Sequence, residues 1–240
     1  MGRREISRRR RWAWGVVVLF ALTAPPFGAT AASLGGIVSA DLYAWSDAAS
    51  VPVPTPIAED DFDCRGFLDG RKDLYGNVWV DHRGRWRCAG GETARATRRV
   101  RFGQVTVDVG VSDRLNITTY VSSVSRRRNR SGPGISFLSD GRAHMYVIYE
   151  RDRGRITLAS RDRRGLRSLV TVPISDRDAL EMRVELRLPD IAVLVDGAAV
   201  INYTLSAAEL ASFGSNTRFG LEADRDRWSR FDWFRVEALP

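Results

Sequence analysis

Apolar residues recur at every second position through most of this chain, and this period restricts the fold more than any other feature. Between positions 181 and 188 charged and apolar residues alternate without a break: Glu181, Met182, Arg183, Val184, Glu185, Leu186, Arg187 and Leu188. The segments 104–111 and 115–122 alternate in the same way. Because successive side chains of a β-strand point to opposite faces, each segment has one buried and one solvated face. This pattern is typical of antiparallel strands that cover a core on one side.

Short turn sequences separate the alternating segments. Four of them combine aspartate and glycine, which tolerate the positive φ angles of tight turns: Asp140-Gly141, Asp152-Arg153-Gly154, the stretch from Asp162 to Gly165, and Asp196-Gly197. Only a short stretch, 206–212, has the spacing of a helix. Roughly a dozen short strands joined by hairpins predict an all-β fold, an antiparallel β-sandwich of the jelly-roll type.

The N-terminal segment has the features of an export signal. A basic start is followed by an apolar run from Trp12 to Leu22 and by small residues up to Ala31. This order predicts a signal peptide at 1–31 that is cleaved after Ala31. The protein is then expected to be secreted or to reside in the cell envelope.

The rest of the chain divides into a linker and one domain. Alternating prolines favour an extended linker at 32–57, followed by a single β-sandwich domain at 58–240. The alternative for the N-terminus is a retained membrane anchor, because no charged residue occurs between Arg11 and Asp41. Contact with a membrane is expected only if that segment is retained.

The chain has two cysteines, Cys64 and Cys88. In an oxidising compartment an even count favours a disulfide bridge, and two buried thiols are the alternative. The two histidines, His82 and His144, do not lie near the cysteines at the spacing of zinc ligands. We therefore expect a disulfide and no metal site of this kind.

The net charge of +8 at first suggests an anionic partner. Six arginines among the first eleven residues, offset by Glu5, supply +5 of it, and the mature chain carries only +3. Nucleic acid is therefore not an expected partner. Two arginine-rich loops, 126–130 and 161–167, are expected to be solvated hairpin tips, which could attract an acidic polysaccharide if they meet.

Three segments match elements of one known family. They are Asp60-Asp61-Phe62 followed by Trp79 and Gly84-Arg85-Trp86, the hairpin 191–203 around Asp196-Gly197, and Phe231-Asp232-Trp233-Phe234-Arg235-Val236. Together they resemble the concanavalin A-like lectin/glucanase jelly rolls, which include laminin G-like modules. The resemblance implies the fold of that family over about Ala58 to Leu239. Members bind carbohydrate, hydrolyse it or bind proteins, so the resemblance supports the fold more than a function.

Most of the matching residues are expected to serve packing. The aromatic residues Phe62, Trp79, Trp86 and Phe234 are expected in the core, because aromatic side chains dominate the interiors of such sandwiches. Asp61 and Asp232 could pair across the first and last strands at a structural calcium ion, but two carboxylates fall short of the six to eight oxygens that calcium takes. No other cofactor is expected.

The segment 222–226 resembles a catalytic strand. Glu222, Asp224 and Asp226 alternate, and retaining glucanases of this fold use a Glu-x-Asp-x-Glu strand. The segment departs from that pattern because its last carboxylate belongs to an aspartate and it lies just before the terminal strand. The neighbouring Arg225 and Arg227 favour a solvated loop. We expect Glu222 on the surface and no catalytic residue.

The parity of the final strand predicts a binding face. It places Trp233 with Phe231 and Arg235 on one side, where an indole ring could stack on a sugar while the guanidinium bonds its hydroxyls. Tyr120 has the same character, because it lies among polar residues opposite an aliphatic row. The alternative is that Trp233 packs against the sandwich.

These observations predict an exported, non-catalytic, lectin-like β-sandwich that binds carbohydrate through Tyr120, Trp233 and Arg235. The alternative is a structural or adhesive domain that binds a protein, and an endo-glucanase is the third hypothesis. The oligomeric state and the particular glycan do not follow from the sequence.

Overall fold

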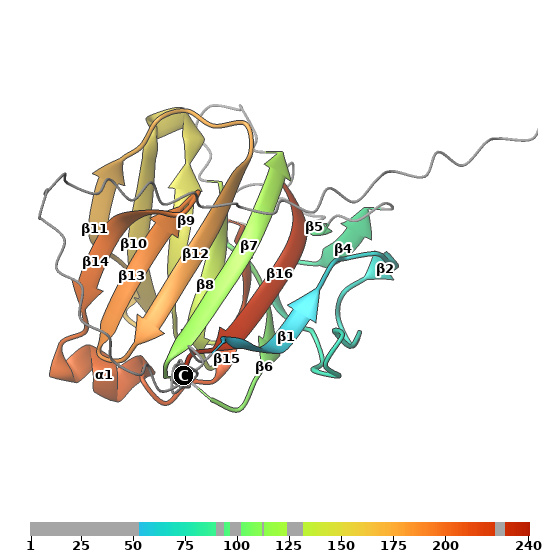
Figure 1. Ribbon diagram of the computed structural model, residues 1–240, viewed down its shortest axis with the longest axis horizontal. Helices are drawn as coiled ribbons and strands as arrows, with labels where there is room; N and C mark the ends of the chain where they lie inside the picture. The colour runs from blue at the N-terminus through green and yellow to red at the C-terminus, as the bar shows by residue number, and fades with distance from the viewer. Residues whose placement is uncertain (1–52, 90–93, 97–101, 112, 124–131, 224–228) are drawn as a thin grey trace, which may run out of the picture. The chain divides into compact units, whose positions relative to one another are not determined.

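The structure is a computed structural model that describes residues 53–89, 94–96, 102–111, 113–123, 132–223 and 229–240. Its strands form two antiparallel sheets that lie face to face, with the larger sheet in front in Figure 1. The sheets have nine and seven strands. The predicted antiparallel β-sandwich is confirmed.

Each sheet combines strands that are far apart in the sequence. The nine-stranded sheet has the order β14-β13-β12-β7-β16-β5-β4-β2, with β1 also paired to β16. Its strands are β1 (Thr55–Asp60), β2 (Arg65–Phe67), β4 (Trp86–Ala89), β5 (Ala94–Ala96), β7 (Leu115–Ser123), β12 (Leu180–Arg187), β13 (Asp190–Val195), β14 (Ala198–Thr204) and β16 (Arg230–Ala238). The seven-stranded sheet has the order β11-β10-β9-β8-β15-β6-β3. Its strands are β3 (Val80–Arg83), β6 (Gly103–Asp108), β8 (Pro133–Ser139), β9 (His144–Glu150), β10 (Arg155–Asp162), β11 (Gly165–Pro173) and β15 (Arg218–Ala223).

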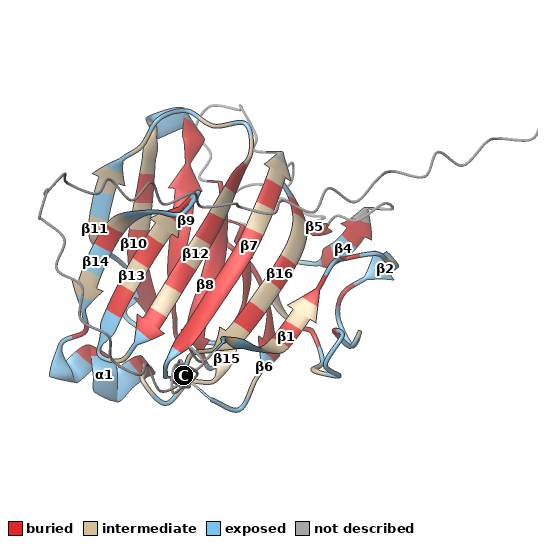
Figure 2. Ribbon diagram, viewed as in Figure 1, coloured by how far each residue is buried: buried red, intermediate tan, exposed pale blue. Residues whose placement is uncertain are grey.

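The core lies between the two sheets. Along β12 and β16 in Figure 2, buried positions alternate with partly exposed ones, as the period of two predicts. The four aromatic residues expected in the core, Phe62, Trp79, Trp86 and Phe234, are completely buried. The Trp79 ring, directly before β3, lies 5.9 Å from the ring of Phe62, which follows β1, and 5.4 Å from the ring of Phe234 on β16. One aromatic cluster therefore joins these three parts of the chain.

The four aspartate–glycine turns connect strands as predicted. They join β8 to β9, β9 to β10, β10 to β11 and β13 to β14. In the last of them Asp196 and Gly197 both have positive φ angles, 49° and 80°, as a type I′ hairpin turn requires. At Gly141 a Cβ atom would lie 2.6 Å from the His82 ring, so only glycine fits this turn.

The one α-helix of the described residues, α1 (Ala207–Phe213), follows β14. Ser206 caps its N-terminus, and the Ser206 and Glu209 side chains each bond the other residue's backbone N–H as a capping box. The helix coincides with the stretch that the sequence predicted.

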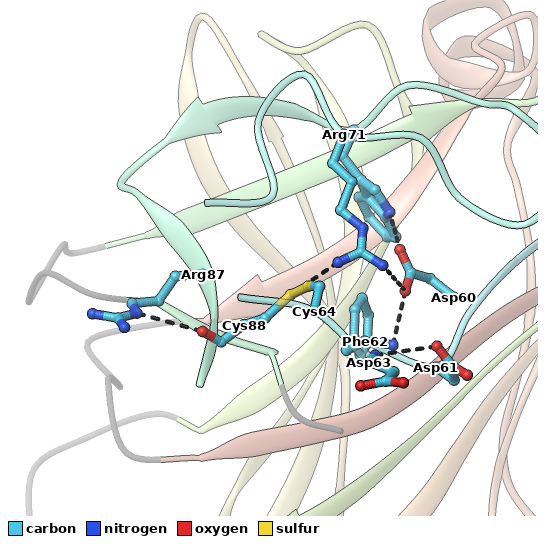
Figure 3. Close-up of a disulfide and its surroundings, with 9 residues drawn as sticks. Asp60, Asp61, Phe62, Asp63, Cys64, Arg71, Arg87 and Cys88 are labelled. Carbon is cyan, nitrogen blue, oxygen red and sulfur yellow. Dashed lines mark hydrogen bonds and ion pairs between the residues drawn. A yellow bond between two sulfur atoms is a disulfide. The ribbon is translucent and has the colours of Figure 1, made fainter. Parts of the chain in front are cut away.

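The disulfide between Cys64 and Cys88 is confirmed, with the two Cα atoms 5.5 Å apart (Figure 3). It lies where β2 pairs with β4 at one end of the nine-stranded sheet. The bridge therefore ties the segment after β1 to the edge of that sheet.

The expected signal peptide lies outside the described residues, as does most of the expected linker. The first strand, β1, begins at Thr55, inside the segment expected as linker. In the described part of the chain no helix is long and apolar enough to cross a membrane.

Candidate functional site

The three predicted binding residues lie together on the outer face of the nine-stranded sheet. Trp233 on β16 is directly opposite Tyr120 on β7, and Arg235 is opposite Thr118, the next outward position of β7. Trp233, Arg235 and Tyr120 are all partly exposed, whereas the residues between them on β16 and β7 point into the core. We call Tyr120, Trp233 and Arg235 the platform.

Charged and polar residues surround the platform in rows that cross β12, β7 and β16. One row is Glu181, Tyr120 and Trp233; the next is Arg183, Thr118 and Arg235; the third is Glu185, Asn116 and Glu237. Acidic and basic rows therefore alternate along the sheet. Arg183 lies 3.3 Å from Glu181 and 3.8 Å from Glu185, so these side chains join neighbouring rows.

Arg235 is held at the centre of several contacts. Its guanidinium donates to the Glu59 carboxylate on β1 and lies 3.7 Å from the carboxylate of Glu237. The guanidinium carbon is 5.9 Å from the centre of the Trp233 ring. The hydrogen bond to Glu59 raises the pKa of Arg235, and the nearby charges of Glu59, Glu237 and Tyr75 add to the effect. The guanidinium is therefore fixed beside the indole ring and stays charged.

A hollow of about 280 Å³ continues the same face toward the other edge of the sheet. Asn202, Ala192 and Glu185 are among the residues that line it. The pairing of β14, β13, β12 and β7 places these three residues in one row with Asn116. The outer face thus offers hydrogen-bonding groups on both sides of the platform.

The expected position of Phe231 is wrong. Phe231 was expected to share the face of Trp233, but it is buried with its ring 5.7 Å from that of Trp86. The register of β16 against β7 shifts on both sides of Phe231. These irregularities place Asp232 out of the regular alternation, so that Phe231 and Trp233, two residues apart, point to opposite faces.

The other sheet carries a buried polar layer that was not predicted from the sequence. Many polar side chains on the face of the seven-stranded sheet opposite the core are buried, and strands β8 and β9 are buried throughout. They include Gln104, Thr106, Ser136, His144, Tyr146, Arg161 and Glu222. The Gln104 amide donates to Ser136 at 2.6 Å and to Ser139 at 3.1 Å, and His82 and Thr106 share a hydrogen bond of 2.8 Å.

Glu222 belongs to this layer, so the expectation that it lies on the surface is wrong. Its carboxylate is 3.5 Å from the His144 ring, and both side chains are inaccessible to solvent. Burial, with the positive charges of Arg161, Arg83 and His82, lowers the pKa of His144 to about 3. At neutral pH the contact is therefore made by a neutral imidazole.

The arginine-rich loops are only partly described. Residues 126–130 lie outside the described part of the chain. Arg161 is not at a solvated hairpin tip, because its side chain is buried. Its guanidinium carbon lies 3.4 Å from the centre of the Phe102 ring. Arg164 and Arg167 are exposed beside α1, where they line a pocket of about 260 Å³.

The two aspartates considered for calcium have other partners. Asp61 accepts a hydrogen bond from the backbone of Asp63, and Asp232 accepts one from the Ser122 hydroxyl. Within the described ranges no group of three or more histidine, cysteine, aspartate or glutamate side chains is arranged to hold a metal ion.

No protein-family model matches the sequence, and no curated protein does. Solved structures match it by shape. The carbohydrate-binding module CBM66 from Bacillus subtilis superposes with a TM-score of 0.53 and 13% identity, over 71% of this chain and 97% of the module. SCLam, a non-specific endo-β-1,3(4)-glucanase of family GH16, gives a TM-score of 0.54 and 12% identity, over 80% of this chain and 94% of the glucanase.

The domain has the concanavalin A-like jelly-roll fold. The Crh5 transglycosylase shares it, with a TM-score of 0.51 and 12% identity over 79% of this chain and 89% of the enzyme. Proteins with this jelly roll therefore include a binding module, a hydrolase and a transglycosylase. Because one fold serves such different activities, a function has to be argued from the site.

Proposed function

We propose that this domain binds a neutral glycan on the platform without cleaving it. The observation that carries the proposal is the cross-strand pair of Trp233 and Tyr120 on the outer face of a sheet whose core is complete without them. Aromatic rings stack on the apolar faces of sugar rings, and a fixed guanidinium donates hydrogen bonds to the hydroxyls. Trp233 and Arg235 place these two groups side by side.

The charges around the platform support a neutral ligand. Arg183 and Arg235 are accompanied by Glu59, Glu181, Glu185 and Glu237. Each arginine lies near two glutamates, so an acidic polysaccharide would meet more negative than positive charge here. Like charges in an interface disfavour binding, whereas hydroxyl groups can use both kinds of partner.

The described carboxylates give no support to glycoside hydrolysis at the platform. A retaining enzyme needs two carboxyl groups about 5 to 5.5 Å apart on either side of the scissile bond. The carboxylates of Glu59 and Glu237 both form ion pairs with Arg235 and hold its guanidinium in position. Glu222 lies on the other sheet and is inaccessible in this structure.

A glycan array tests the proposal. Wild-type protein and the Trp233→Ala variant are applied to neutral glucan, mannan, galactan and mucin-type oligosaccharides of one to six units, with acidic polysaccharides alongside, at low and high salt. We expect the wild type to bind at least one neutral glycan at both salt concentrations and the variant to lose that signal.

Three other outcomes contradict the proposal. Salt-sensitive binding of acidic glycans alone assigns recognition to the exposed arginines. Equal binding by the Trp233→Ala variant places the ligand elsewhere on the domain. If the wild type binds no glycan on the array, the proposal of carbohydrate binding is wrong and a protein partner is favoured.

A further inference from the structure

A compact hairpin stands beside the platform, at residues 70–79. Its two arms are joined by hydrogen bonds from Gly70 N–H to the Trp79 carbonyl and from Trp79 N–H to the Arg71 carbonyl, both 2.8 Å long. Lys72 and Val78 form a further antiparallel bridge. We call this segment the 70–79 hairpin.

The tip of the hairpin is fixed by one buried carboxylate. Asp73 Oδ1 accepts the backbone N–H groups of Tyr75 at 2.9 Å and of Asn77 at 2.8 Å. Asp73 Oδ2 accepts the Asn77 side-chain amide at 2.9 Å and the backbone N–H of Glu59 at 3.2 Å. The tip is thus bonded to itself and to β1, so its side chains are held in place before any ligand arrives.

The base of the hairpin is anchored in the same way. The Trp79 indole N–H donates to Asp60 Oδ2 at 2.8 Å, and the other Asp60 oxygen accepts the backbone N–H of Phe62 at 2.8 Å. Figure 3 shows Arg71 lying between Asp60 and the disulfide. The Arg71 guanidinium is 4.0 Å from Asp60 and 3.7 Å from the Cys88 sulfur. The base of the hairpin is therefore tied to the buried Asp60 and to the disulfide, and its tip to the backbone of β1.

This ordered tip presents large apolar side chains to solvent. Leu74 is 67% exposed, Tyr75 is 51% exposed and Val78 is 43% exposed. Among them only Tyr75 has an aromatic ring with a polar hydroxyl, the combination that can stack on a sugar and also form a hydrogen bond. Fixing this ring in advance also reduces the conformational entropy that a ligand must overcome.

Glu59 joins the hairpin to the platform. Its carbonyl accepts the N–H of Leu74 at 2.9 Å, and its carboxylate accepts a hydrogen bond from Arg235, its partner across β1 and β16. Tyr75 follows Leu74 directly in the chain, so the bond from Leu74 to Glu59 and the ion pair of Glu59 with Arg235 place the tip of the hairpin beside Arg235. Arg235 thus lies between this tip and the Trp233 ring, whose centre is within 6 Å of the guanidinium carbon.

We infer that Tyr75 forms a second sugar subsite next to Trp233, so that the domain takes at least two consecutive units of a linear neutral glycan. One unit stacks on Trp233 and Tyr120, the next contacts the Tyr75 ring, and Arg235 donates to hydroxyls of both. The inference rests on the proposed function, because it extends the same platform. It adds that affinity depends on chain length and that the 70–79 hairpin supplies this dependence.

The test compares oligosaccharides of one to six units from the best neutral glycan of the array described above. Affinity of the wild type is expected to rise from one unit to two or three units. The Tyr75→Ala variant is expected to bind the single unit as the wild type does and to lose about tenfold in affinity for longer chains, which corresponds to the 1.4 kcal/mol of one stacking contact. Tyr75→Phe keeps the ring and is expected to retain the wild-type dependence.

Leu74→Ala is the matched control, because Leu74 is the neighbouring exposed residue of the same tip. It is expected to leave the chain-length dependence unchanged. If Tyr75→Ala keeps the full dependence while Trp233→Ala abolishes binding, the second subsite is wrong and the proposed function stands. If Leu74→Ala loses as much as Tyr75→Ala, the tip acts as a general apolar contact and the inference of a stacking subsite is wrong. If the wild type binds no glycan, the proposed function itself fails.

Discussion

Trp233 and Tyr120 face each other across β16 and β7, in register, on the one side of the nine-stranded sheet that the core does not use. A side chain of β7 also holds the backbone of β16 at this point, because the Thr119 hydroxyl donates to the Trp233 carbonyl at 2.6 Å. Phe234 and Thr119, the next pair along the strands, are completely buried. Trp233 and Phe234 are therefore neighbours in the sequence, but the first side chain lies on the surface and the second in the core.

The first prediction uses that contrast between Trp233 and Phe234. Trp233→Ala is expected to weaken glycan binding by about 1 to 3 kcal/mol, taking stacking energies on aromatic side chains as a guide, with a small change in the free energy of unfolding. Phe234→Ala is expected to destabilise the fold by about 3 to 5 kcal/mol, because it leaves a cavity in the core. Calorimetric titration and denaturant unfolding of both variants measure the two effects. A loss of stability for Trp233→Ala as large as that for Phe234→Ala would place the indole in the core.

The second prediction concerns the disulfide. Replacing Cys64 and Cys88 with serine is expected to lower the free energy of unfolding by about 3 kcal/mol, because the bridge restricts the unfolded chain. For a domain of this size the melting temperature should fall by about 10 °C. Reductant should produce a similar fall in the wild type and none in the double variant. Alkylation of both cysteines without reduction would show that the bridge is absent from the purified protein.

The alternation of the sequence predicted the strands and the core well, since both follow from the period of two. It predicted that Tyr120 faces outward, whereas the burial of Trp79 and Trp86 was predicted from their aromatic character. It could not predict Phe231, because the irregularities of β16 change the parity and no glycine or proline marks them. A bulge that is set by pairing with a neighbouring strand leaves no local signal in the strand itself.

The buried polar layer and the 70–79 hairpin escaped prediction for different reasons. Alternation indicates which face a residue such as Gln104 or Glu222 occupies but not whether that face is covered. Gly134 and Gly220, opposite Ile148 and Thr106 on neighbouring strands, were the available signals of close packing on that face. The hairpin has no period at all, and its order comes from side-chain bonds to Asp73.

The third prediction follows from the lowered pKa of His144. Between about pH 3, its folded value, and pH 6.5, its ordinary value, the unfolded chain binds a proton on this histidine and the folded chain does not. The free energy of unfolding contributed by His144 therefore falls as the pH is lowered through this window. His144→Gln is expected to show a weaker decrease of stability from pH 6.5 to pH 4 than the wild type.

The comparison between variant and wild type is needed because other groups act in the opposite direction. Burial raises the pKa of Asp81 to about 6, and it also raises that of Asp60. A carboxyl group of this kind binds more protons in the folded state and favours folding at lower pH. Asp81→Asn, which removes one such group, is the control and should change the pH dependence with the opposite sign. Equal slopes for His144→Gln and wild type would show that His144 titrates normally in the folded protein.

The last prediction separates the two faces of the molecule through Glu222. Glu222→Gln changes the buried polar layer of the seven-stranded sheet and does not touch the platform on the nine-stranded sheet. We expect the variant to bind the array's best glycan as tightly as the wild type, whereas Trp233→Ala does not. Neither the wild type nor Glu222→Gln is expected to release reducing sugar from a mixed-linkage β-1,3(4)-glucan. Hydrolysis by the wild type that Glu222→Gln abolishes would show that the buried face becomes accessible and that the domain is an enzyme. Loss of glycan affinity in Glu222→Gln without loss of stability would move the binding site from Trp233 to the face that carries His144 and Glu222.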